Sequence, residues 1–250
     1  MEIVQSNCLK SITGLKHGFF RPGKERSLED NLSFKSAPHE VVLRARRRAC
    51  GLLEIPPENL THVYQEHGTK IWPVTQEHRG AGALTGEDPV GRGDALITRE
   101  ENLPLAILIA DCLPIFFAAP DAGVIGLAHA GWRGTFDEIS VKTVERMRSE
   151  FGVKLQDLKV WIGPGISAEG FTIGEDLWDK FRERWGAYRD CFRESTTSID
   201  LKRLNRRQLV EAGVSSDQIE ISEDCTFSDP SWMASICPSV RYRMIMRNGQ

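Results

Sequence analysis

The densest apolar part of the chain lies between residues 103 and 128 and consists of two runs separated by a turn. Leu103 to Ala110 is almost wholly apolar, which predicts a strand buried on both faces. Pro120 to Gly123 is typical of a turn, and Val124 to Ala128 forms the second run. We therefore expect the two runs to form an antiparallel hairpin in which paired residue numbers sum to about 243.

This hairpin would bring a thiol and an imidazole together. In the predicted register Cys112 falls opposite Gly131, and a shift of one or two residues brings it level with His129. Directly opposed residues on one face have Cβ atoms roughly 4.5–5.5 Å apart. Pro114 cannot donate a backbone hydrogen bond, so we expect it to bend or bulge its strand. That distortion decides whether Cys112 and His129 share a face.

Helical periodicity is clearest in a segment rich in arginine. Apolar residues from Val41 to Leu52 share one face of a helix predicted from Pro38 to Leu53. The arginines at 44, 46, 47 and 48 lie mostly elsewhere, and we expect them on a solvated face. Other expected helices are Glu175 to Trp185 and Asp200 to Ala212, and other expected strands are Leu60 to Tyr64, Thr69 to Val74, Asp94 to Thr98, Lys159 to Ile162, Ile219 to Ile221 and Val240 to Met246.

A further helix is predicted directly after the second apolar run. Thr135 and Glu138 have the spacing of a capping box, which predicts a helix from Thr135 to about Phe151. Arg133 precedes this helix. Together with the free backbone N–H groups and the helix dipole, it predicts an anion site. The alternative role of Arg133 is a surface ion pair.

The sequence around His67 differs from that around the other nearby histidines. His67 lies in a tight connection, Gln65-Glu66-His67-Gly68, between two expected strands, whereas His62 and His78 lack such a context and are expected on the surface. The Gly-rich stretch from Gly80 to Gly93 predicts a long loop. It does not have the phosphate-loop pattern.

Composition narrows the class of protein. The chain has 250 residues, 40% of them apolar and 27% charged, with a net charge of −3, so no general attraction to nucleic acid or membrane is expected. Its apolar runs are too short to span a bilayer, and its first residues lack a signal-peptide core. Six cysteines without a CxxC pair favour reduced cytoplasmic thiols. With no repeat or linker, residues 1–250 are expected to form a single domain.

Six motifs occur in order: Tyr64-Gln-Glu-His67-Gly, Asp94-Ala-Leu, Ala110-Asp-Cys112-Leu-Pro-Ile, His129-Ala-Gly-Trp-Arg-Gly134, Ile162-Gly-Pro-Gly-Ile and Cys225-Thr226. Together they resemble the YfiH-type laccase-domain family, which has been named for polyphenol oxidase, purine nucleoside phosphorylase and peptidoglycan-editing activities. The resemblance covers roughly Val63 to Thr226, with weaker matches at His17-Gly-Phe-Phe and Asn31-Leu32.

The resemblance implies an α+β fold, a layered α/β/β/α domain with mixed β-sheets. It implies a single metal site, usually zinc, whose ligands map onto His67, Cys112 and His129. The implied activities are phosphorolysis of adenosine, inosine and methylthioadenosine, and deamination of adenosine. The expected substrates are then a purine nucleoside and phosphate. The protein itself is expected to be a monomer or a homodimer.

The types of residue present support a catalytic metal site independently of the family resemblance. Two histidines and one cysteine are a known catalytic zinc set that leaves a fourth position for water or substrate. Zinc lowers the pKa of bound water to about 7, which supplies a nucleophile at neutral pH. In this hypothesis Cys112 and His129 are catalytic. Asp111 and Gln65 orient the ligands or the substrate, and Arg133 holds phosphate near the ribose.

Three alternatives remain open. A cysteine amidohydrolase acting on a peptidoglycan precursor would use Cys112 as nucleophile, His129 as base and Asp111 as helper. A copper site could also use two histidines and a cysteine, although six histidines are too few for a multicopper oxidase. A binding module with a vestigial metal site is favoured by departures from the family pattern at residues 21–24 and 227–250.

Overall fold

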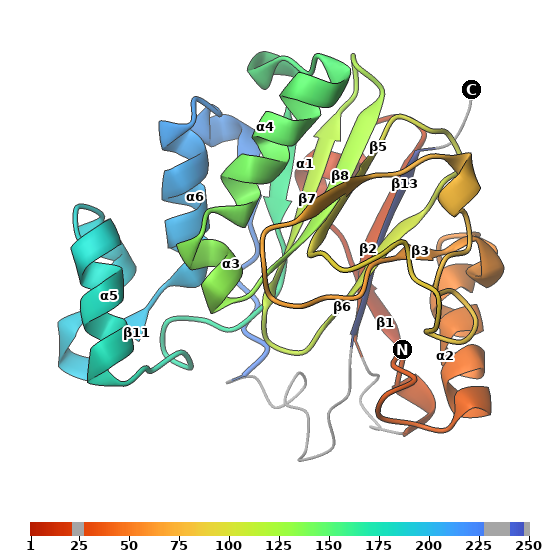
Figure 1. Cartoon of the computed structure of the whole chain (residues 1–250), viewed down its shortest axis with the longest axis horizontal. Coiled ribbons are helices and arrows are strands. Elements are labelled where there is room, and N and C mark those ends of the chain that lie inside the picture. Colours follow the sequence, from red (N-terminus) through yellow and green to blue (C-terminus); the bar gives the residue numbers. More distant parts are fainter. Residues whose placement is uncertain (22–27, 228–240, 248–250) are drawn as a thin grey trace.

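Two β-sheets form the middle layers of the molecule. The computed structural model describes residues 1–21, 28–227 and 241–247 (Figure 1). One sheet has the order β1 (Glu2–Val4), β2 (Leu15–Arg21), β13 (Arg241–Arg247), β6 (Leu105–Ile109) and β3 (Thr61–His62). The other has the order β12 (Ile219–Ile221), β9 (Lys159–Ile162), β7 (Leu113–Ala119), β8 (Val124–Ala130), β5 (Ala95–Thr98) and β4 (Ile71–Pro73). A small ribbon joins β10 (Phe192–Arg193) to β11 (Ser198–Ile199).

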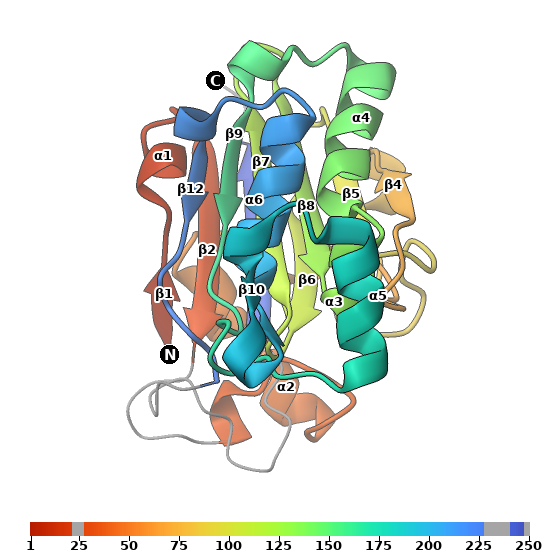
Figure 2. The ribbon, with the colours of Figure 1, turned by 90° about the vertical axis from the view of Figure 1, so that its left-hand side faces the viewer.

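Helices cover both outer faces. α2 (His39–Gly51) lies on the outer side of the five-stranded sheet, and the helices α3 (Trp132–Phe136), α4 (Ile139–Phe151), α5 (Glu175–Trp185) and α6 (Leu201–Glu211) lie beyond the six-stranded sheet (Figures 1 and 2). The short α1 (Asn7–Lys10) follows β1. This is the predicted layered α/β/β/α arrangement with mixed sheets. Among the described residues, no helix combines the length and apolar character that crossing a membrane requires.

Strand β7 shows why the layers hold together. Successive side chains of a strand point to opposite faces. Phe116 packs between the two sheets against Trp161, whereas Ile115 and Phe117 pack toward the helical layer. All three are fully buried. A strand that is apolar on both faces is therefore required at the centre of the six-stranded sheet.

The predicted hairpin is present with the predicted register, but its first strand is different. Leu113 pairs with Ala130 and Ala119 with Val124, so paired numbers sum to 243. The partner of β8 is β7, not the run from Leu103 to Ala110, which forms β6 of the other sheet. The turn at Pro120 selects the apolar strand directly before it, and β7 is as apolar as β6.

The expectation that Pro114 distorts its strand is wrong. Pro114 pairs with His129 in an unbroken register. The His129 N–H donates to the Asp94 carbonyl at 2.7 Å, on the β5 side, and the Pro114 carbonyl accepts from the Gly163 N–H at 2.9 Å. Pro114 and His129 thus form a non-hydrogen-bonded pair, and the missing N–H of Pro114 removes no bond between β7 and β8.

The predicted capping box is also wrong, although the helix ends where expected. Thr135 lies inside α3 and is buried, and its hydroxyl accepts a hydrogen bond from Asn205 of α6 at 2.9 Å. Glu138, with φ +63°, separates α3 from α4. α4 ends at Phe151, followed by Gly152 in the left-handed conformation that favours glycine. Thr135 therefore serves packing between helices rather than capping.

One arginine of α2 departs from the expected solvated face. Arg46 is 2% exposed, and its guanidinium donates to the carbonyls of Leu32 at 3.2 Å, Gly82 at 3.2 Å and Ala83. Buried charged groups need such hydrogen bonds. Arg46 therefore ties the segment before α2 to the Gly-rich loop, and these two segments form one wall of the site described next.

Candidate metal centre

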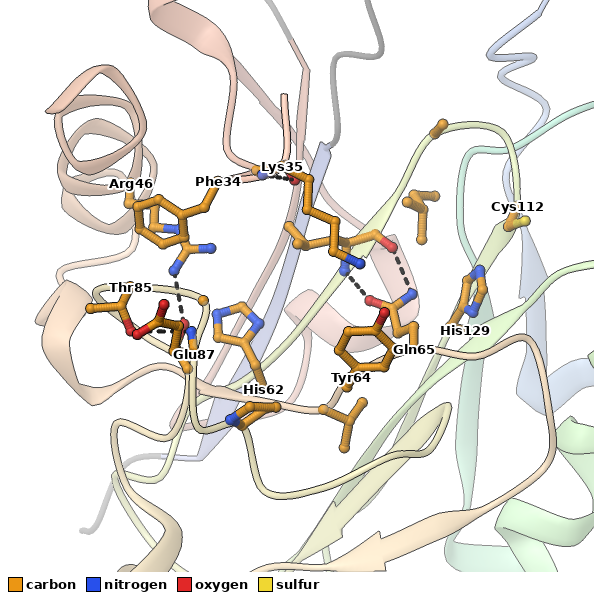
Figure 3. A pocket seen from close by; sticks show the side chains of 18 of the residues that line it. Phe34, Lys35, Arg46, His62, Tyr64, Gln65, Thr85, Glu87, Cys112 and His129 are labelled. Carbon is orange, nitrogen blue, oxygen red and sulfur yellow. Dashed lines mark hydrogen bonds between the residues drawn. The ribbon is translucent and has the colours of Figure 1, made fainter. Parts of the chain in front are cut away.

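The structure brings the three predicted metal ligands together from separate segments. His67 lies in the connection between β3 and β4, Cys112 directly precedes β7, and His129 lies in β8. Their ligand atoms all lie within 4.8 Å of one another. The two imidazole rings meet edge to face, with centroids 4.7 Å apart. Figure 3 shows Cys112 and His129 side by side at one end of a pocket.

Asp94 organises this cluster, and sequence reasoning gave it no role. Its fully buried carboxylate accepts a hydrogen bond from His129 Nδ1 at 2.7 Å. It also accepts from the backbone N–H groups of His67 at 2.9 Å and Gly68 at 2.7 Å. Because Asp94 engages Nδ1 of His129, Nε2 is the nitrogen left for an ion. The available signal was an aspartate placed between the Gly-rich loop and a buried strand.

The backbone of His67 is held in an uncommon conformation. Its φ of +63° lies in the left-handed region, where histidine is found more often than most other residues. Such a conformation persists when the surroundings enforce it. Here Asp94 binds the N–H groups on both sides of the Cα of His67, so the carboxylate that orients His129 also fixes the loop that presents His67.

Cys112, His129 and Asp94 shift one another's pKa values. Burial raises the pKa of the Cys112 thiol, but hydrogen bonds and the charges of His129 and His67 outweigh burial and lower it to about 6. Burial lowers the pKa of His129, but Asp94 and Cys112 outweigh it and raise the pKa to about 9. Burial likewise opposes ionisation of Asp94, yet hydrogen bonds from His129 and Gly68 keep its pKa below the usual value. Without an ion, Cys112 is therefore a thiolate and His129 an imidazolium at neutral pH, and an ion would replace the proton on His129 Nε2.

These residues fit a divalent metal ion. A thiolate and two imidazoles are borderline-soft donors of the kind that zinc prefers, and three protein ligands leave one position open. Gly131 provides the space, since a Cβ there would lie 3.0 Å from Cys112 Sγ and 3.1 Å from His67 Cδ2. Among the described residues, the group of histidine, cysteine or acidic side chains that lie close enough together to share an ion consists of His67, Cys112 and His129.

The cluster opens into a cavity of about 520 Å³. Its walls come from the segment before α2, the strand β3 and the residues after it, the Gly-rich loop and the end of β6. The lining residues are Ser33, Phe34, Lys35, Arg46, His62, Val63, Tyr64, Gln65, His67, Gly82, Thr85, Gly86, Glu87, Pro89, Leu108, Ile109, Ala110, Cys112 and His129. Pockets of this size hold small-molecule ligands.

His62 was expected on the surface, and that expectation is wrong. It is 5% exposed and lines the cavity. Its backbone is bonded to Ala81 at 3.0 Å and Val90 at 2.9 Å, so the Gly-rich loop folds over it. Burial holds the pKa of His62 well below its usual value, so the ring is neutral at pH 7.

The other predicted site residues are placed differently. Gln65 lines the cavity, and its side-chain amide exchanges two 2.7 Å hydrogen bonds with the backbone of Leu108 in β6 (Figure 3). Asp111 is outside the lining set and accepts a hydrogen bond from Thr226 at 2.8 Å. Arg133 is exposed, outside the lining set, and stacked over Trp132 with its guanidinium carbon 4.2 Å from the ring centre. Residues 22–27 and 228–240, which include departures from the family pattern, lie outside the described residues.

Comparison with curated proteins finds similar sequences along most of the chain. The chain is 37% identical over 222 residues to "Purine nucleoside phosphorylase YlmD" of Geobacillus stearothermophilus, which covers 86% of this chain and 81% of that protein. It is 36% identical over 194 residues to the protein of the same name in Bacillus subtilis, covering 76% and 69%. A "Purine nucleoside phosphorylase" of Bacteroides thetaiotaomicron is 35% identical over 204 residues, covering 78% and 76%.

Solved structures share the fold. YlmD from Geobacillus stearothermophilus superposes with a TM-score of 0.87 at 32% identity, covering 95% of this chain and 93% of that one. The Bacillus licheniformis hypothetical protein YfiH gives a TM-score of 0.87 at 26% identity, covering 96% and 95%. The model of the family described as "Multi-copper polyphenol oxidoreductase laccase" matches residues 17–235. The chain therefore belongs to this laccase-like family, together with YfiH and YlmD.

Proposed function

We propose that this chain is a zinc-dependent purine nucleoside phosphorylase that also deaminates adenosine. The observation that carries the proposal is the convergence of His67, Cys112 and His129 at one end of a cavity large enough to hold a nucleoside. The names of the three curated relatives described above support the phosphorylase activity. The family description mentions several coppers. Among the described residues, however, one group of side chains is close enough to share an ion, which supports a site for a single metal ion.

In phosphorolysis, an oxygen of hydrogenphosphate forms a bond to C1′ of the ribose while the bond from C1′ to N9 of the purine breaks. The proton of hydrogenphosphate ends on the departing purine, and ribose 1-phosphate is formed. His67, Cys112 and His129 would hold the ion, which supplies Lewis acidity and lowers the pKa of bound water when present. Asp94 keeps the imidazole of His129 oriented, and Gln65 fixes the cavity wall through Leu108.

In deamination, a water oxygen forms a bond to C6 of adenosine, and the bond from C6 to the amino nitrogen breaks. Ammonia leaves and inosine remains. The same end of the cavity would serve both reactions, with the purine or the ribose turned toward the three ligands. Asp111 and Arg133 do not line the cavity, so this proposal gives them no contact with the substrate.

One observation favours a second candidate, a cysteine amidohydrolase. Cys112, His129 and Asp94 form the sequence of thiolate, imidazole and carboxylate that activates a cysteine nucleophile. The helper in such a triad would be Asp94, because Asp111 is bonded to Thr226. A bound metal would occupy the thiolate and exclude this chemistry.

The test combines metal analysis with a product assay. The purified protein is analysed for zinc and copper and then incubated with inosine or adenosine and phosphate, and products are separated by chromatography. The proposal expects one zinc per chain and the release of hypoxanthine, adenine and ribose 1-phosphate, all lost in His129→Ala. A protein without zinc that forms no product above that variant contradicts it, and rapid cysteine-dependent amide cleavage would favour the second candidate.

A further inference from the structure

Lys35 carries the cationic group in the cavity that is least engaged by protein partners. It lies in the segment before α2 and lines the cavity. Its ammonium group lies 4.4 Å from the centre of the Tyr64 ring, and Figure 3 shows the side chain extended toward Tyr64 and Gln65. Within residues 1–21, 28–227 and 241–247 it forms no ion pair with a carboxylate. Glu87 also lines the cavity but is not paired with Lys35.

The second cation of the cavity wall is engaged differently. Arg46 directs its guanidinium at the main-chain carbonyls of Leu32, Gly82 and Ala83. These bonds satisfy Arg46 and fix the wall. A lysine ammonium has three donors, and a contact with an aromatic face uses none of them in a conventional hydrogen bond. Lys35 thus has donors to offer to a ligand.

The backbone that carries Lys35 is fixed in advance. The Ser33 N–H donates to Asn31 Oδ1 at 2.9 Å, and the Lys35 N–H donates to Ser33 Oγ at 3.2 Å. Asn31 Nδ2 reaches Ser36 Oγ at 3.1 Å and closes the turn. A cation on a preformed turn loses less freedom on binding an anion than one on a free loop.

Arg92 also contacts Tyr64, but it does not line the cavity. Its guanidinium carbon lies 4.8 Å from the centre of the ring, and the guanidinium is paired with the Glu66 carboxylate at 3.7 Å. Among the described residues, Lys35 is therefore the cation at this ring that has no carboxylate partner, and an anionic ligand can pair with it.

From these contacts we infer that Lys35 binds the phosphate consumed in the reaction. The inference rests on the proposed function and deepens it by assigning the phosphate position. Lysine is a common phosphate ligand that acts as a point charge. The assignment replaces the sequence-based expectation for Arg133, whose guanidinium is exposed over Trp132 and does not line the cavity. Phosphate would then lie beside Gln65, on the wall formed by Phe34 and Tyr64.

The kinetic test compares Lys35→Met, Lys35→Arg and Arg133→Met in the zinc-loaded protein. Loss of a charged hydrogen bond predicts that Lys35→Met raises the KM for phosphate about tenfold to a hundredfold. The KM for inosine should stay within about twofold, and Lys35→Arg should restore most of the phosphate affinity. A raised phosphate KM in Arg133→Met but not in Lys35→Met overturns the inference.

A binding test separates this inference from the proposed function. Inorganic phosphate is titrated calorimetrically into the zinc-loaded protein without nucleoside, so no turnover is needed. Binding that is weakened in Lys35→Met and retained in Arg133→Met supports the assignment even if no phosphorolysis is found. No phosphate binding by the native protein overturns it. A third arm uses adenosine 5′-phosphate as substrate, and an effect of Lys35→Met on this nucleotide alone would assign the anion to an ester and also overturn the inference.

Discussion

The Asp94 carboxylate accepts a 2.7 Å hydrogen bond from Nδ1 of His129 while its own oxygens also hold the backbone of the loop that presents His67. Two of the three candidate metal ligands thus depend on one side chain. Replacing a residue that orients a metal ligand in this way commonly lowers metal affinity or activity about tenfold to a hundredfold.

Replacing Asp94 should therefore weaken the metal site. Asp94→Ala frees Nδ1 of His129 and removes the acceptor for His67 and Gly68, so we expect zinc affinity to fall about tenfold to a hundredfold. Competition with a chromophoric chelator measures this. Asp179→Ala, an exposed acid on α5, is the matched control and should leave affinity unchanged. Equal affinities in both variants would contradict the role of Asp94.

Gly131 should be required for its lack of a side chain. In Gly131→Ala the new Cβ lies 3.0 Å from Cys112 Sγ, so the sulfur and the His67 ring must move apart. We expect zinc binding to be lost while the far-ultraviolet circular dichroism spectrum is retained. Gly51→Ala, at the end of α2 with open space around it, should bind zinc normally. Normal zinc binding by Gly131→Ala would show that the cluster tolerates a larger neighbour.

The thiol of Cys112 should be selectively reactive when metal is absent. Its pKa of about 6 predicts that alkylation by iodoacetamide rises with a midpoint near pH 6 and is rapid at pH 7. Burial raises the pKa of Cys8 to about 11 and that of Cys50 and Cys191 to about 12, so these thiols should react slowly. Peptide mass mapping identifies the modified residue.

Two further measurements check the origin of this reactivity. His129→Gln removes the main group that lowers the pKa, and the midpoint should then move toward the ordinary value near 9. Zinc should protect Cys112 in the native protein by occupying the sulfur. A midpoint that is unchanged in His129→Gln would rule out the thiolate–imidazolium pair as the cause.

His17 should make the fold acid-sensitive. Burial, together with Lys10, lowers its pKa to about 4, below the value near 6.5 in the unfolded chain. Because the unfolded state binds the proton more readily, the free energy of unfolding falls as pH decreases from 6.5 to 4. The loss between pH 7 and pH 5 should be about 2 kcal/mol. Urea titrations at the two pH values measure it, and His17→Gln, which keeps an acceptor for the Ser6 N–H, should remove it. The exposed His39→Gln is the control.

The sequence allowed the register of the site's hairpin to be predicted, because the turn at Pro120 to Gly123 determines which residues face each other. It did not identify the first strand. Runs around Ile107 and Phe116 are both continuously apolar, and the pattern does not distinguish two strands that are buried on both faces. His67, Cys112 and His129 were predicted as metal ligands from residue type and motif resemblance. The structure confirms that their side chains converge.

Roles that depend on distant partners could not be predicted. Arg46 is buried because carbonyls from Leu32 and the Gly-rich loop receive its guanidinium, and His62 is buried because the same loop folds over it. Asp94 is decisive only because β5 pairs with β8 and places it behind His129. A sequence pattern reports the face of an element, whereas these side chains are determined by contacts between elements.

The connection that carries His67 runs from β3 in one sheet to β4 in the other, and it is attached at both sides. Gln65 fastens it to β6 of the five-stranded sheet, and Asp94 fastens it to the start of β5 in the six-stranded sheet. Any sliding of one sheet over the other must therefore shift His67 relative to Cys112 and His129. An ion bound by all three side chains would cross-link this connection to strands β7 and β8. Binding of the ion would therefore resist sliding of the two sheets and make the sandwich mechanically stiffer.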